Sequence, residues 1–129
     1  LVDQALADAG ADRTVVLLER AAVHAADGRP VQARADYEAV LADLERLPRG
    51  RWAELIAGLA ATGDLAPVAG RLREALDTAT DAASDDAHLY LARGVFYQRI
   101  GRLENATNEF SYATELDPDL LEAWLGARP

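Results

Sequence analysis

The sequence predicts an all-α protein of about eight helices that pack as successive helix pairs. The first observation is a pattern of glycine, small and aromatic residues that recurs three times with constant internal spacing. The second is the position of Pro30 and Pro67. Each follows a glycine turn and stands where a helix is expected to start. Proline, which has no amide proton, is tolerated there because the first amide of a helix has no partner within the helix. The third is composition, because half of the 129 residues are apolar, which is enough to build a core.

The clearest copy of the pattern lies between residues 87 and 118. It contains, in order, Tyr90, Gly94, Tyr97, Gly101, Ala106, Phe110, Ala113 and Pro118. These residues stand at the spacing W-x2-L-G-x2-Y…A-x3-F…P, and the segment resembles a tetratricopeptide repeat. Gly94 is expected to let a neighbouring helix approach closely, and Gly101 to turn the chain between two helices. Tyr97 and Phe110 are expected to fill the space between those helices.

Two weaker copies precede it, beginning at Leu17 and Trp52 where the third begins at Tyr90. In each copy a glycine follows after 11 residues, a small or branched residue after 5 more, and a large apolar residue after 4 more. The copies also depart from the family pattern. Arg20 and Arg93 stand where leucine is preferred, and His24 replaces the tyrosine.

The resemblance implies a right-handed α-solenoid. We expect a single domain over residues 1–129 that consists of a partial repeat helix (1–10), three repeats (14–48, 49–84 and 85–118), and the start of a further repeat or a capping helix (119–129). Ser84 is expected to cap the helix that follows it. Gly70 falls inside a predicted helix, where glycine costs about 1 kcal/mol relative to alanine, so we expect it to serve close packing.

Charge and composition narrow the classes of partner. The net charge of -9 arises from 22 acidic residues against 13 basic ones, all of them arginine, and the basic residues are dispersed. This disfavours nucleic acid, which needs clustered positive charge. No stretch reaches the roughly 18 consecutive apolar residues of a membrane span, so membrane insertion is not expected. The cytoplasm is the default location, and the lysine-free, alanine- and arginine-rich composition suggests a bacterial source.

No constellation of catalytic or metal-binding residues is recognisable, so we expect no enzyme activity, no cofactor and no metal. Cysteine is absent, and without lysine no phosphate-binding P-loop can form. His24 is expected to be a buried, hydrogen-bonded core residue. His88, near the start of its helix, is expected to be exposed and incidental.

The family resemblance implies that the first helices of successive repeats line a concave surface that binds peptides or helices. Leu18, Leu91 and Val95 are expected to anchor an apolar or amphipathic helix there, with Gln98 and Arg99 fixing its orientation. An alternative explanation is compositional, because alanine is so abundant that an alanine face carries little information. The predicted lining residues are Val15, Leu18, Ala22, Ala25, Ala53, Ala57, Ala60, His88, Leu91, Val95, Gln98 and Arg99.

These observations predict a non-catalytic protein-interaction module or scaffold whose partner is a protein or peptide. An alternative is a regulatory or sensor segment of a larger multidomain enzyme or transcription regulator, in which the helices contact a neighbouring domain. An enzyme has little support. A final apolar stripe is a candidate surface for self-association, and it consists of Leu120, Leu121, Trp124 and Leu125.

Overall fold

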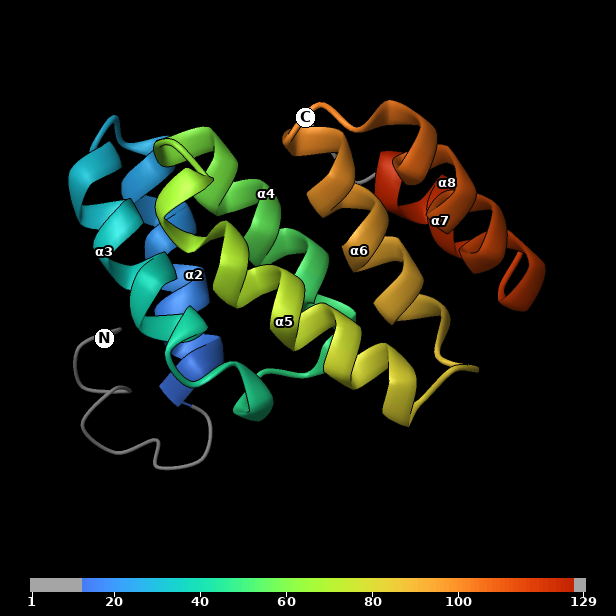
Figure 1. Ribbon diagram of the computed structural model, residues 1–129. Coiled ribbons are helices and arrows are strands. Elements are labelled where there is room, and N and C mark those ends of the chain that lie inside the picture. The colour runs from blue at the N-terminus through green and yellow to red at the C-terminus, as the bar shows by residue number, and fades with distance from the viewer. Residues whose placement is uncertain (1–12, 127–129) are drawn as a thin grey trace. The chain divides into compact units, whose positions relative to one another are not determined.

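The computed structural model describes residues 13–126, and all regular structure within that range is helical, which confirms the all-α prediction. The predicted helix at residues 1–10 and the last residues of the predicted segment 119–129 lie outside this range. The helices, shown in Figure 1, are α2 (Arg13–Ala26), α3 (Pro30–Leu41), α4 (Trp52–Thr62), α5 (Ala66–Ala82), α6 (Ala87–Arg99), α7 (Leu103–Leu116) and α8 (Leu120–Gly126), with short 3₁₀ turns η2 (Leu44–Arg46) and η3 (Arg49–Arg51) before α4.

The chain divides into two compact units, residues 1–64 and residues 65–129. The first contains α2, α3 and α4, and the second contains α5 to α8. The boundary falls inside the predicted repeat 49–84, so α4 and α5, which were predicted to form one helix pair, belong to different units.

In the first unit, α2 and α3 form an antiparallel pair joined by a short turn at Gly28 (Figure 1). Gly28 has a φ of 74°, a left-handed conformation that glycine adopts without strain. Helix α4 packs against α3, and Gly58 allows this contact because a Cβ there would lie 2.3 Å from Cζ of Tyr37. The Tyr37 ring thus occupies the space that a side chain at residue 58 would need.

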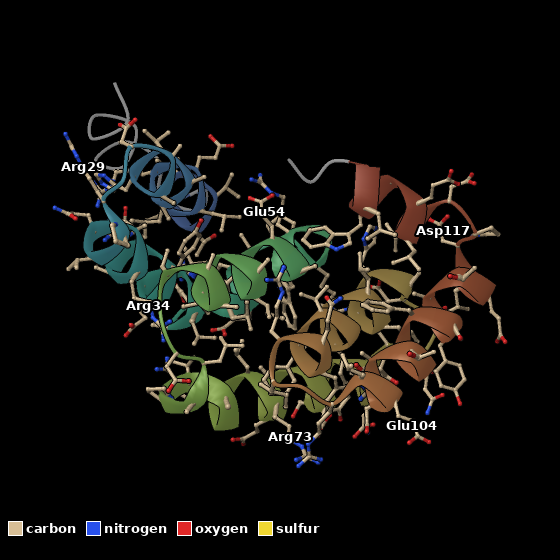
Figure 2. The ribbon with its side chains drawn as sticks, turned by 90° about the horizontal axis from the view of Figure 1, so that it is seen from above. Arg29, Arg34, Glu54, Arg73, Glu104 and Asp117 are labelled. Atoms are coloured by element: carbon tan, nitrogen blue, oxygen red, sulfur yellow. The ribbon has the colours of Figure 1, made fainter. Side chains whose placement is uncertain are left out.

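The end of α4 is held by an arginine from α3, a contact that no local sequence pattern indicates. Arg34 (Figure 2) donates from Nη1 to the carbonyl of Leu59 and from Nη2 to that of Asp64, both at 2.7 Å. Carbonyls at the end of a helix lack partners inside the helix, so a cation there stabilises it. A Cβ at Gly63 would lie 2.9 Å from Arg34 Nη1, so the glycine leaves room for the guanidinium.

In the second unit, α6 and α7 form the main pair, with α5 packed on α6 and α8 on α7. Gly94 meets the ring of Phe110, because a Cβ at this position would lie 2.6 Å from Cε1 of the ring. This confirms the predicted close approach. Gly101 turns the chain between the two helices with a φ of 85°, also as predicted. Tyr97 and Phe110 are partly buried, whereas Phe96 is fully buried.

Two local predictions are wrong. Helix α6 starts at Ala87, and its N-cap is Asp86, whose Oδ1 accepts a hydrogen bond of 3.0 Å from the amide of His88. Ser84 lies too early to cap this helix, and its carbonyl accepts instead from the Tyr90 hydroxyl. Gly70 is exposed and has no atom within 4 Å of the place of a Cβ, so it serves no close packing.

Candidate protein-interaction surfaces

The predicted lining residues of the first unit divide into core and surface. Leu18 is completely buried and Ala53 is 3% exposed, so neither is accessible to a partner. Ala22 and Ala25 on α2 are exposed, and Val15 on α2 together with Ala57 and Ala60 on α4 are partly exposed. The accessible part of the predicted lining in this unit therefore consists of Val15 and four alanines, referred to below as the alanine surface. Glu19 of α2 and Glu54 of α4, both paired with Arg51, lie one turn before these alanines.

In the second unit, the predicted anchors Leu91 and Val95 are 3% and 0% exposed. Their predicted role as anchors for a partner is wrong, as it is for Leu18, because all three side chains are core residues. Gln98 is exposed, and His88 and Arg99 are partly exposed. The predicted polar part of the lining is therefore accessible, while its apolar part is not.

The arginines that depart from the family pattern form matching ion pairs in the two units. In the first unit, Arg20 Nε lies 2.8 Å from Asp36 Oδ2, and its Nη2 lies 2.9 Å from Oδ1. In the second, Arg93 pairs through Nε with Glu109 and through Nη1 with Asp77 Oδ1 at 3.2 Å. The Arg20–Asp36 pair joins α2 to α3, and the Arg93–Glu109 pair joins α6 to α7. The two partners are 16 residues apart in each pair.

Equivalent positions carry these pairs. Arg20 stands three residues after Leu17, as Arg93 does after Tyr90. At the corresponding places in the middle copy are Leu55, which is fully buried, and the exposed Arg71. The slot therefore accepts either a buried leucine or an arginine with a carboxylate on the helix that packs against it.

The electrostatics of these pairs indicate a structural role. Burial lowers the pKa of Arg93, but hydrogen bonds and charge from Glu109 and Asp77 raise it by more, so that it lies above the ordinary value. Asp36 and Glu109 are each only 7% exposed and each accepts from an arginine. Each carboxylate is thus engaged by a permanently charged guanidinium on the neighbouring helix.

Neither histidine lies in a catalytic arrangement. His24 Nε2 is 3.9 Å from Asp36 Oδ2, beyond hydrogen-bond distance, and its buried Nδ1 has no partner among the described residues. The prediction of a hydrogen-bonded core histidine is therefore wrong, and the side chain is 22% exposed. His88 is partly exposed near the start of α6. Within residues 13–126 no three histidine, aspartate or glutamate side chains converge as metal ligands would.

An open groove of about 540 Å³ runs along α7 and beside α8. The predicted stripe on α8 lies on one side of this groove. Leu125 is 55% exposed, and the other three residues of the stripe are partly buried. The available signal for the α7 side was Leu103, which lies four residues before Thr107 and continues the same helix face. The lining residues are Thr107, Phe110, Ser111, Thr114, Glu115 and Leu121.

No helix within the described range combines the length and the apolar character that a bilayer crossing requires. No model of a known protein family matches the chain, and comparison with curated proteins and with solved structures finds no similar protein. The tetratricopeptide resemblance therefore stays a prediction.

Proposed function

We propose that this chain is a non-catalytic protein-interaction module built from tetratricopeptide-like helix pairs that stack as a right-handed solenoid. The observation that supports it best is the matching ion pair, Arg20 with Asp36 and Arg93 with Glu109. A repeat framework reuses the same contact at the same slot. The most buried charged groups thus hold helices together, which leaves the helix surfaces as the functional part of the molecule.

The alanine surface of the first unit is the proposed contact area. Ala22 and Ala25 on α2, with Ala57 and Ala60 on α4, present methyl groups and no charge. Small side chains let the backbone of a second helix come close, and an amphipathic helix supplies the larger apolar side chains itself. The partner proposed for this surface is therefore a helical segment of another protein, docked by its apolar face.

Affinity capture from a native lysate, followed by mass spectrometry, tests the proposal with a matched pair of variants. Ala22→Lys places a cation on the contact area, whereas Ala35→Lys makes the same change at an exposed position of α3 outside it. A partner bound as proposed is retained by the wild type and by Ala35→Lys, and its recovery falls about tenfold with Ala22→Lys. Equal recovery with both variants would exclude the alanine surface as the binding site.

A further inference from the structure

We propose that the groove between α7 and α8 binds a basic, amphipathic helix of a partner protein. This surface lies on other helices than the alanine surface of α2 and α4, so the inference goes beyond the proposed function. It rests on three features of the groove: its floor, its length and the charge around it.

The floor is apolar although three of its residues carry hydroxyl groups. Thr107 donates to the carbonyl of Leu103 at 2.9 Å, Ser111 to Thr107 at 3.0 Å, and Thr114 to Phe110 at 2.9 Å. Each hydroxyl is thus used by the carbonyl four residues earlier in α7. Besides the Glu115 carboxylate, the groove therefore offers a ligand mainly the methyl groups of the two threonines, the Phe110 ring and the Leu121 side chain.

The apolar surface continues beyond the groove along both helices. Leu103, Thr107, Phe110 and Thr114 recur at the spacing of one helix face, which is about 16 Å long at 1.5 Å per residue. Leu103 is 65% exposed at one end of this face. On α8, Leu125 stands one turn after Leu121 and is 55% exposed. The length corresponds to about three turns of a partner helix.

The charge on α7, on α8 and on the turn between them has one sign, and Arg102 directly precedes α7. Residues 103–126 contain six acidic side chains and no lysine, arginine or histidine. Of the six, Glu109 pairs with Arg93, and the other five form no ion pair with a described residue. Those five are Glu104, Glu115, Asp117, Asp119 and Glu122.

The acids lie where they would flank a ligand. Glu115 lines the groove, and Glu104 lies on the same edge of α7 eleven residues earlier. Figure 2 shows Glu104 at the start of α7 and Asp117 just after its end. A helix with an apolar stripe flanked by lysine or arginine complements such a groove in shape and charge. A second copy of this chain fits poorly, because its own net charge is -9.

The test uses two synthetic helical peptides of about 18 residues, roughly five turns, with identical leucine faces. One carries lysine on its polar face and the other glutamate, and binding to the full chain is followed by fluorescence anisotropy. The lysine peptide is expected to bind at least about tenfold more tightly, and its affinity is expected to fall as salt rises from about 0.05 to 0.5 M. Equal affinity of the two peptides would overturn the proposal.

Two pairs of variants distinguish the groove from general attraction to an acidic protein. Thr114→Arg and Glu115→Lys alter the groove, while Thr78→Arg and Glu74→Lys make the same charge changes on the exposed surface of α5. The groove variants are expected to weaken the lysine peptide about tenfold, and the α5 variants less than about twofold. Circular dichroism checks that all four remain helical.

Equal weakening by both pairs of variants would show that binding is not at the groove and would overturn the proposal. Sedimentation tests the competing occupant. A dimer of the wild type that Thr114→Arg dissociates would show that a second copy fills the groove, which would also contradict the proposal. Either failure leaves the proposed contact area on α2 and α4 unaffected, because its variants lie on different helices.

Discussion

Arg93, whose side chain is only 19% exposed, holds a carboxylate on each of two helices, Glu109 on α7 and Asp77 on α5. Its planar fork of donors can serve two acceptors at once, which a leucine in the same slot cannot do. The Tyr90 ring lies beneath the cation, 5.8 Å from ring centroid to Cζ. Arg93 therefore stabilises the second unit both by packing on a ring and by pairing with two carboxylates.

Arg93→Leu is expected to lower the free energy of unfolding by about 3 kcal/mol, because Glu109 stays buried without its cation. Arg93→Leu combined with Glu109→Leu is expected to recover most of that loss, since a buried pair replaced by apolar residues is close to neutral. Urea unfolding measures both. Arg71→Leu, on the exposed surface of α5, is the control. If Arg93→Leu alone lowers the free energy of unfolding by less than about 1 kcal/mol, the pair with Glu109 is not buried as described.

Tyr37 gives the chain a dependence on alkaline pH. Burial of the ring, reinforced by the nearby Glu54 carboxylate, raises the pKa of Tyr37 above its ordinary value. Above about pH 10 the unfolded chain ionises this phenol while the folded chain does not, so stability is complete below pH 10 and is lost as pH rises further. Tyr37→Phe is expected to make the fall between about pH 10 and 11 shallower in urea unfolding. An unchanged slope, as with the surface control Tyr112→Phe, would contradict this account.

At the scale of elements, the α6–α7 pair depends on the absence of a side chain at Gly94. The Phe110 ring lies against the α6 backbone there, and a methyl group 2.6 Å from its edge would force the ring or the helix to move. Gly70 in α5 offers the opposite case, because it is surrounded by open space. The two glycines separate the effect of packing from the effect of helix propensity.

Gly94→Ala is expected to destabilise the chain by about 1 to 3 kcal/mol, because overpacking outweighs the better helix propensity of alanine. Gly70→Ala is expected to stabilise it by about 1 kcal/mol, because only the propensity changes. Thermal unfolding by circular dichroism measures both. The same sign of change for the two variants would contradict the described contact between Gly94 and Phe110.

The positions of the helices were predictable from sequence because their signals are local, although the pairing of α4 with α5 was not. A glycine turn such as Gly28, a proline in the first helical turn such as Pro30, and a fixed interval between them identify a pair without knowledge of distant contacts. Leu18 and Val95 show what local patterns do not predict, which is whether an apolar side chain is buried by the chain itself or exposed to a partner. Apolar residues on two faces of a helix indicate that both faces are covered, but not whether the chain or a partner covers them.

The Arg34 contact with the end of α4 and the groove on α7 were not predicted, for a related reason. Arg34 reaches carbonyls 25 and 30 residues away, and no local pattern specifies such a contact. The groove depends on threonine hydroxyls that bond within their own helix, so residues that read as polar in the sequence present methyl groups.

At the scale of the whole molecule, the net charge of -9 repels polyanions. We expect no complex with duplex DNA or with transfer RNA at about 0.15 M salt and micromolar protein, because phosphate binding needs clustered cations. Fluorescence anisotropy of labelled nucleic acid measures this. A dissociation constant below about 1 µM would show that the dispersed arginines form a binding surface after all.

In the proposed function, the chain acts by presenting helix surfaces to a partner protein. Amide hydrogen exchange of the full chain, alone and bound to the partner recovered by capture, tests it most directly because exchange reports coverage helix by helix. We expect added protection in α2 and α4, or in α7 and α8 if the partner is a basic helix, and little change in α3 and α5. No recoverable partner, or protection confined to α3 and α5, would contradict it.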